Sequence, residues 1–296
     1  MVNHRSKLES LAIYFLLIAG SVIMFYPFLF QVLASFGSNV DYYNTVVIPI
    51  PTEIHLDRYL NLIHNSLIYH YLINTLIRCV YYIAVTCFVS LIASYVFTKL
   101  RFKGRDTVFI IFLTSMMVPG QVTLIPTYLL FARFPFIGGN DWMGQGGHGM
   151  IDTWGALLLG SGIVNVAAIF LVKQTMESIP FEYEEAARID GAGVFRTIFG
   201  IYFPMTRAVL AVIVITTFIA IWNDYLWPLV AINSPGIQVI NTGVTSLLST
   251  MMSSGQVPMY PDFFALTAIV MLPPILVYLL LQRNFIQGYA MAGVKG

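Results

Sequence analysis

Charged side chains are scarce in this sequence of 296 residues, of which they make up only 10%. Soluble domains carry roughly 25% charged residues. Hydrophobic residues reach 58%, and a soluble core could not hide that much apolar surface. The scarcity of charge therefore predicts an integral membrane protein, and we expect an all-α fold because helices satisfy their backbone polar groups within the bilayer.

The sequence also lacks an excess of basic residues and is poor in cysteine. It has 15 Lys and Arg against 14 Asp and Glu, and without a basic patch no nucleic-acid partner is expected. Its two cysteines, Cys79 and Cys87, are eight residues apart in one apolar run. On a helix they would be separated by roughly 12 Å along the axis, which is beyond the reach of a disulfide.

Patterns for catalysis, nucleotide binding and metal binding are absent as well. The phosphate-binding spacing GxxxxGK followed by Ser or Thr does not occur, and neither does a nucleophile elbow or an HExxH motif. The spacing of His55, His64 and His70 places no pair on one helical face, so no metal site is predicted. We therefore expect a protein that is not an enzyme and has no cofactor of its own.

Long apolar runs divide the chain into six expected transmembrane helices. About 20 apolar residues are needed to cross a bilayer as a helix. The expected spans cover about residues 11–36, 71–97, 107–131, 155–172, 208–230 and 263–281, and together they form one domain over residues 1–296. The first run is longer than the apolar region of a signal peptide, so we expect it to remain as an uncleaved helix.

Basic residues predict how these spans are oriented. Arg58 and Arg133 fall on one side of the expected membrane and Arg78 falls within a span, whereas the other 12 of the 15 Lys and Arg fall on the opposite side. Lys and Arg are enriched in cytoplasmic loops. The distribution therefore places both termini and the loop after the fourth span in the cytoplasm.

That loop, residues 177–204, is the one long polar and charge-dense interruption of the apolar chain, and we call it the coupling segment. Three acids precede Arg188 in its first half, with Pro180 in the first turn and Gly191 just past the end, as suits a helix and its macrodipole. The acids are Glu182, Glu184 and Glu185. Apolar residues recur with helical spacing after Gly191. The segment is predicted to form a helix, a tight turn and a second helix.

The coupling segment resembles the EAA loop of the membrane subunits of bacterial ABC importers. Glu185-Ala186-Ala187 is followed after three residues by Gly191, and after nine more by Ile201-Tyr202-Phe203-Pro204. Phe203 stands where that pattern has leucine. Further segments resemble the shorter, six-span carbohydrate permease of the maltose-importer type: Asn74-Thr75-Leu76, RFKGR after the second span, Ile125-Pro126, WNDYLWPL and the terminal Gly293-Val294-Lys295-Gly296.

This resemblance implies an ABC importer permease fold with a cytoplasmic coupling helix, in the cytoplasmic membrane of a bacterium. It implies a heterodimer with a second permease subunit, an ATPase dimer that binds ATP and Mg, and an extracytoplasmic binding protein that delivers a carbohydrate. Residues of the coupling segment would meet the ATPase: Glu184, Glu185, Ala186, Ala187, Asp190 and Gly191. Ser253, Ser254 and Gly255 would contact the binding protein.

Polar residues within the spans are candidates for the substrate path. They are Arg78, Gln121, Tyr128, Asn165, Asn223 and Asp224. Arg78 either faces the path, which would favour an acidic oligosaccharide, or extends to the outer interface. The aromatic residues around Asn223 and Asp224 suit a sugar ring, but they also suit an interfacial belt. The remaining three are polar residues of the kind that also bond neighbouring helices.

A second class of function remains open at this point. A secondary transporter of a small polar solute, working as a single chain, would also have several kinked spans. It would be expected to carry acids within the membrane for ion coupling, and an internal inverted repeat. Neither is found in the sequence, and no catalytic cluster supports a membrane enzyme.

Overall fold

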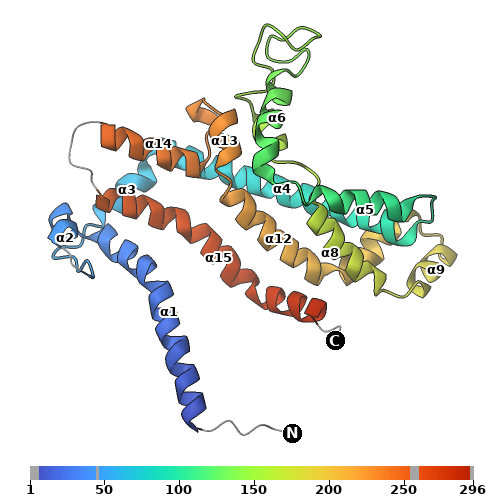
Figure 1. The fold of residues 1–296 in the computed structure, drawn as a ribbon, viewed down its shortest axis with the longest axis horizontal. Helices are drawn as coiled ribbons and strands as arrows, with labels where there is room; N and C mark the ends of the chain where they lie inside the picture. Colours follow the sequence, from blue (N-terminus) through green and yellow to red (C-terminus); the bar gives the residue numbers. More distant parts are fainter. Residues whose placement is uncertain (1–6, 45–46, 254–259, 294–296) are drawn as a thin grey trace. The chain divides into compact units, whose positions relative to one another are not determined.

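The computed structural model describes residues 7–44, 47–253 and 260–293, and every regular element in these ranges is a helix (Figure 1). The chain divides into two compact units. The first is built from residues 1–66 and 244–272, and the second from residues 67–243 and 273–296. The all-α architecture expected from the composition is confirmed within the described ranges.

The first unit contains α1 (Lys7–Phe36), α2 (Asn39–Asn44), α3 (Asp57–His64), the end of α14 (Ile240–Ser253) and the start of α15 (Tyr260–Gly293). Arg58 of α3 connects these helices. Its Nη1 donates to the carbonyl oxygens of Ser35, at 2.8 Å, and Gly37, at 2.9 Å, while its Nε pairs with the carboxylate of Asp262. One guanidinium therefore ties the end of α1 to the start of α15.

The second unit carries most of the helices. These are α4 (Ser66–Lys99), α5 (Arg105–Ser115), α6 (Gly120–Ala132), α7 (Trp154–Leu159), α8 (Val166–Glu177), α9 (Glu182–Ile189), α10 (Val194–Thr197), the π-helix η1 (Ile198–Tyr202), α11 (Phe203–Met205), α12 (Arg207–Trp222), α13 (Leu226–Ala231) and η2 (Pro235–Ile237). The core lies along α4, where Leu91 and Tyr95 pack with Val172 of α8 and Ile213 of α12.

Only some of the expected spans are single straight helices. In the described ranges three helices are long and apolar enough to cross a bilayer: Glu9–Phe36, Ser66–Lys99 and Tyr260–Gln282. Counting each of two bent pairs as one span raises the number to five; the bends are 97° between α5 and α6, and 81° between the helices before and after Thr206. The helices of the described ranges therefore do not confirm the expected count of six spans.

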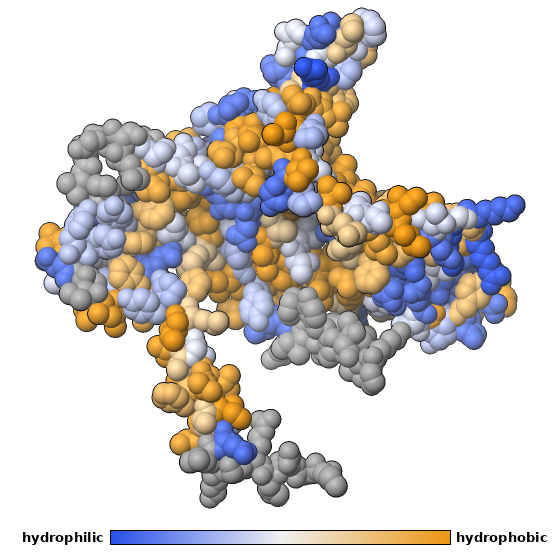
Figure 2. Space-filling view, viewed as in Figure 1, coloured by the Kyte–Doolittle hydropathy of each residue, from blue (hydrophilic) through white to orange (hydrophobic). Residues whose placement is uncertain are grey.

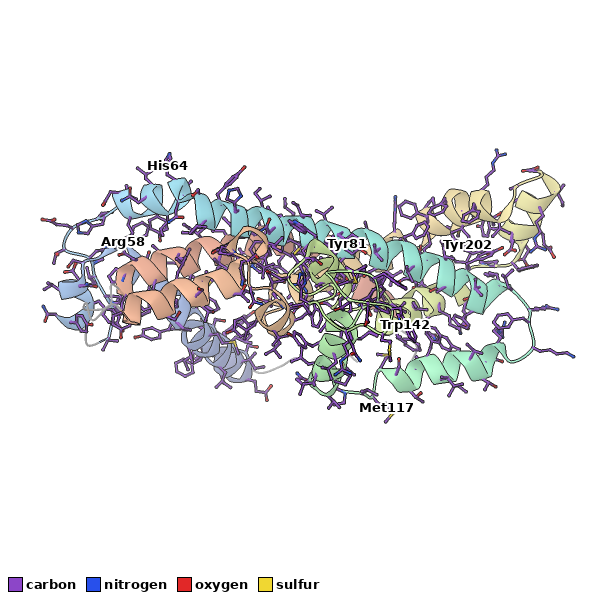
Figure 3. All side chains as sticks on the ribbon, turned by 90° about the horizontal axis from the view of Figure 1, so that it is seen from above. Arg58, His64, Tyr81, Met117, Trp142 and Tyr202 are labelled. Atoms are coloured by element: carbon purple, nitrogen blue, oxygen red, sulfur yellow. The ribbon has the colours of Figure 1, made fainter. Side chains whose placement is uncertain are left out.

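The third and fourth expected spans are broken for local reasons. Pro119 has an extended backbone, with ψ 133°, and proline disfavours a helical conformation in the residue before it, so α6 begins anew at Gly120. Figure 3 labels Met117 in the turn between the two arms. In the fourth, Gly162 has a φ of +84°, and the Asn165 side chain caps the start of α8. The left-handed residue ends one helix and the cap starts the next.

The fifth and sixth expected spans differ in whether the helix is continuous. The fifth is interrupted, because α12 ends at Trp222 and α13 begins at Leu226. The sixth is continuous, because α15 runs through Pro273 and Pro274. Membrane helices tolerate proline where other groups satisfy the freed carbonyls. The boundary between the two compact units falls at this proline pair.

The connection between α6 and α7 is held in one conformation by its own hydrogen bonds. Asn140 Nδ2 donates to the carbonyl oxygens of Ala132, at 2.9 Å, and Phe134, at 3.0 Å. At its far end the Asp152 carboxylate accepts hydrogen bonds from the backbone N–H groups of Asn233 and Ser234. The connection, at the outer end of α6 in Figure 1, is therefore fixed to the chain that follows α13.

Candidate transport and coupling sites

Arg78 is completely buried in the second unit, although it lies within a transmembrane helix. Its Nε donates to the carbonyl oxygen of Leu157 at 3.1 Å, and its Nη2 contacts both the Ser161 hydroxyl and the Asp224 carboxylate. A charge in the bilayer is costly unless it is paired and hydrogen-bonded. Asp224 compensates this charge, and the guanidinium is bound among side chains and backbone of the second unit.

Ser161 and Tyr82 complete the group around Arg78. The Ser161 hydroxyl donates to Asp224 Oδ2 at 2.8 Å, and its backbone N–H donates to the Tyr82 hydroxyl at 3.1 Å. The Tyr82 ring lies 5.6 Å from the guanidinium carbon, within cation–π distance. We call Arg78, Tyr82, Ser161 and Asp224 the arginine cluster; it joins α4, the break after α7 and the break between α12 and α13.

A pocket of about 370 Å³ adjoins the arginine cluster. The cluster contributes Ser161 and Asp224 to its lining, and the Asp224 side chain is 20% exposed. The lining also includes polar side chains of α6 and one ring of α13: Gln121, Thr123, Thr127 and Trp227. Hydroxyl, amide and carboxylate groups beside an aromatic ring are suited to binding a ligand with many hydroxyl groups.

The structure brings together only part of the expected substrate path. Arg78 and Asp224 form an ion pair, and Gln121 shares the pocket with Asp224. Tyr128 packs in the apolar cluster around Trp227 instead. Asn165 accepts a hydrogen bond from the Ala168 N–H at 3.0 Å as the cap of α8. Asn223 is exposed, and its Nδ2 donates to the Ile219 carbonyl at 3.0 Å within its own helix.

The sequence signal was too weak to single out Ser161 and Thr127. Small polar residues are common in membrane helices, where they allow close helix contacts. Gly160, next to Ser161, illustrates such a contact: a Cβ atom there would lie 2.0 Å from the Trp227 ring. Gly160, Ser161 and Trp227 all line the pocket.

The coupling segment contains the short helix that the sequence predicts, α9 (Glu182–Ile189). It is followed by Gly191 with a φ of +75°, and then by α10, η1 and α11. Glu185, Ala186 and Asp190 are exposed, and Ala187 is buried. Figure 2 shows hydrophilic residues gathered at the end of the second unit where α9 lies.

Glu184 faces the interior, unlike the glutamate beside it. Its side chain is fully buried, and its carboxylate accepts hydrogen bonds from three donors: the Tyr95 hydroxyl at 3.0 Å, the Tyr202 hydroxyl at 2.9 Å and Arg188 Nη2 at 2.7 Å. The hydrogen bond to Glu184 raises the pKa of the Arg188 guanidinium. Figure 3 labels Tyr202 beside α4. Nothing in the local pattern marked Tyr95 as a partner, because it lies 89 residues away.

Large apolar side chains are exposed on the same segment. Ile189 is 86% exposed, and Tyr183, Val194 and Phe195 are also exposed. Exposed apolar residues that cluster on a polar surface mark a site of protein contact. Of the three residues expected to touch a binding protein, Ser253 ends α14, while Ser254 and Gly255 lie outside the described residues.

Bent and interrupted apolar helices around a pocket lined by both polar and apolar side chains, with an exposed helix between two of them, are features of a membrane transport protein. The chain belongs to the family described as "binding-protein-dependent transport system inner membrane component", which it matches over residues 87–290. The match includes the coupling segment. The chain is therefore an inner-membrane permease component without a catalytic role, and a single-chain secondary transporter is not favoured.

Individual relatives agree with this family. The lactose transport system permease protein LacG of Rhizobium radiobacter is 33% identical, over 69% of this chain and 68% of LacG. The sn-glycerol-3-phosphate transport system permease protein UgpE of Yersinia enterocolitica is 31% identical over 68% of this chain, and the match spans 65% of UgpE, just under two thirds of its length.

A solved structure shares the fold of this chain. It is the crystal structure of a bacterial ABC transporter involved in the import of the acidic polysaccharide alginate. The alignment has a TM-score of 0.79 and covers 96% of this chain and 99% of the other, at 21% sequence identity. The resemblance to an ABC importer permease fold is therefore confirmed.

Proposed function

We propose that this chain is a transmembrane subunit of an ATP-driven importer that takes up a carbohydrate, most simply an oligosaccharide, from an extracytoplasmic binding protein. The observation that carries this proposal is the family match over residues 87–290, because it includes both the coupling segment and the whole pocket lining. Both compact units would act together as one permease domain over residues 1–296.

ATP is bound and hydrolysed by a partner in this proposal. The sequence has no P-loop, so ATP and Mg belong to an ATPase dimer that meets the exposed side of α9. The exposed residues Glu185, Ala186 and Asp190, with the apolar Tyr183 and Ile189, offer that contact surface. A second permease subunit would complete the membrane part, with both termini of this chain and α9 in the cytoplasm.

The pocket supports a substrate that is recognised by its hydroxyl groups. Lactose and sn-glycerol-3-phosphate, named for the transport systems of the two relatives, differ in charge but both carry hydroxyls. The pocket offers hydroxyl, amide and carboxylate partners, and the charge of Arg78 is already compensated by Asp224. Arg78 therefore gives no reason to favour an acidic oligosaccharide over a neutral one.

Reconstitution tests the proposal. This chain would be co-expressed with a partner permease, an ATPase and a binding protein from the same organism, and the purified complex would be placed in proteoliposomes. ATP hydrolysis is expected to rise when the binding protein carries its sugar, and uptake is expected to stop with an ATPase that cannot hydrolyse ATP. Uptake by this chain alone, driven by an ion gradient, would contradict the proposal.

The same complex identifies the substrate class. Neutral oligosaccharides, uronate oligosaccharides and glycerol phosphates would be compared as stimulants of ATP hydrolysis in the presence of the binding protein. We expect one of the oligosaccharides to stimulate. Stimulation by none of the sugars, with a response to an unrelated solute such as an amino acid, would contradict the carbohydrate assignment.

A further inference from the structure

We infer that Glu184 is a positioning residue, which fastens the coupling helix α9 to the transmembrane core so that movement of α9 is passed to α4 and α12. This inference rests on the proposed function, because it assigns α9 the task of receiving a movement from the ATPase. It separates the roles of two adjacent glutamates: Glu185 is exposed and available to the partner, whereas Glu184 is buried and holds the helix in place.

The helix α9 needs such an attachment because it is short. It has eight residues, and isolated helices of that length are marginal in water. Most of its residues are exposed; only Glu184 and Ala187 are buried. Apart from the small contact surface of Ala187, the Glu184 carboxylate is thus the main group through which this helix contacts the core.

The partners of Glu184 belong to the elements that would have to move. Tyr95 lies near the end of α4, and Tyr202 is the last residue of the π-helix η1, which leads through α11 into α12. Both tyrosines are almost completely buried, and their rings meet edge to face with centroids 5.6 Å apart. The carboxylate therefore joins three separate elements, α9, α4 and η1, at one point.

The π-helix is a second observation at the same place. Such wide turns are rare, and they occur frequently at functional sites. Here the wide turn covers Ile198–Tyr202 and ends on the tyrosine that bonds to Glu184. Among the described residues, Arg188 is the one fully charged donor to the carboxylate, and its side chain is 57% exposed. The carboxylate is therefore held by two neutral tyrosine hydroxyls from the core and by the guanidinium of Arg188 on the exposed side of α9.

The neighbouring lysine strengthens the attachment without contacting the carboxylate. Lys99 Nζ donates to the Ile179 carbonyl at 3.0 Å, just before α9, and lies 5.2 Å from the centroid of the Tyr202 ring. It thereby links the end of α4 to the chain that enters the coupling helix. Charged hydrogen bonds of this kind are stronger than neutral ones, and they resist separation of the elements they join.

The variant Glu184→Gln tests the inference in the reconstituted complex. It keeps the size of the side chain but removes the charge that Arg188 and the two tyrosines share. We expect the complex to assemble and hydrolyse ATP, while the ATP hydrolysed per sugar imported rises at least roughly fivefold, the lower end of typical coupling effects. Glu182→Gln is the matched control, because Glu182 is exposed on the same turn, and its ratio should stay at the wild-type value.

If the Glu184→Gln variant fails to assemble, Tyr95→Phe and Tyr202→Phe test the same inference. Each of these substitutions removes one hydroxyl and leaves the buried ring. Each should raise the ratio of ATP to sugar, and their effects should not add, because both act through one carboxylate. A purely architectural role would lower the amount of complex and leave the ratio unchanged, and that result would overturn the inference. If sugar uptake by the wild-type complex did not depend on ATP hydrolysis, that result would instead overturn the proposed function.

Discussion

The Arg78 guanidinium and the Asp224 carboxylate form a partly buried ion pair between residues that lie 146 positions apart in the sequence. Arg78 belongs to the long helix α4, and Asp224 to the three residues that separate α12 from α13. The pair therefore fixes the break between α12 and α13, in the fifth expected span, to α4, the helix of the second expected span. It also places a carboxylate, and not a cation, at the edge of the pocket.

We predict that Arg78→Gln destabilises the protein because it leaves Asp224 without its charge partner. Removing one member of a fully buried pair costs about 3–5 kcal/mol, and the cost is smaller here because the Asp224 side chain is 20% exposed. Removing both members leaves no uncompensated charge. Arg78→Gln combined with Asp224→Asn should therefore be more stable than Arg78→Gln alone. Thermal unfolding of the purified variants in detergent measures this. Equal stability of the single and double variants would show that the pairing contributes nothing.

The same variants separate a structural role of Arg78 from charge recognition. If the pair is structural, Arg78→Gln lowers the uptake of neutral and acidic sugars by the same factor, and Asp224→Asn partly restores both. Selective loss of acidic-sugar uptake, without rescue, would mean that Arg78 contacts the substrate directly. Competition between the two sugar classes in proteoliposomes distinguishes these results.

The connection between α6 and α7 depends on close backbone packing at Gly144. A Cβ atom there would lie 2.1 Å from the Arg133 carbonyl oxygen, and the φ of +73° already disfavours other residues. Gly104 is a matched control, because its φ is +81° but nothing lies within 4 Å of the Cβ position. Gly144→Ala should thus be less stable than Gly104→Ala by about 1–3 kcal/mol. Thermal unfolding compares them, and equal losses would refute the packing argument.

The Asp152 carboxylate makes the same connection sensitive to acid. Burial alone would raise its pKa, but hydrogen bonds from Ser234 and Asn233 outweigh that effect and lower it. A carboxylate whose pKa is lower in the folded state stabilises the folded protein in full at pH values above its unfolded pKa of about 3.9. This stabilisation is lost as the pH falls through the pKa of the folded state. The connection should therefore resist proteolysis at neutral pH and open below about pH 4.

Asp152→Asn should remove this dependence on pH, because the amide does not titrate in that range. The asparagine also tolerates the left-handed backbone at this position, where φ is +59°. Proteolysis of the connection, followed from neutral to acidic pH by mass spectrometry, checks the prediction. An unchanged pH profile in the variant would assign the acid sensitivity to another group.

Gly191 sets the turn that follows the coupling helix. Its φ of +75° lies in the left-handed region, and no atom lies within 4 Å of the Cβ position. Any cost of substitution therefore comes from the backbone, and is about 1–2 kcal/mol for most residues but less for asparagine. We predict that Gly191→Val raises the ATP hydrolysed per sugar imported, while Gly191→Asn stays close to the wild type.

Glu185→Arg extends this prediction to the exposed side of α9. The substitution reverses the charge offered to the ATPase without disturbing the buried Glu184. It should weaken copurification with the ATPase, whereas Gly191→Val should leave binding intact and affect only coupling. Insertion into the membrane, checked by yield after detergent extraction, should be normal for both. Normal uptake by the Glu185→Arg variant would contradict the placement of α9 at the ATPase.

Much of this protein was predictable from sequence because the relevant signals are local. The scarcity of charge follows from the bilayer as solvent, and the charges and glycine of residues 177–204 mark the ends of α9. Pro119 and Pro126 make a kink in the third span expected from the sequence, but they do not set its 97° angle. Local patterns report which residues favour a helix or a turn, and those preferences depend only on near neighbours along the chain.

The tertiary structure alone decided which polar groups meet. Nothing in the sequence pairs Arg78 with Asp224, or shows that Glu184 points inward to Tyr95 and Tyr202 while Glu185 points outward. Likewise Asn165 is a helix cap and not part of the pocket. The physical reason is that a buried charge must find its partner in space, and that partner is chosen by how the helices pack, not by how far apart the residues lie in the chain.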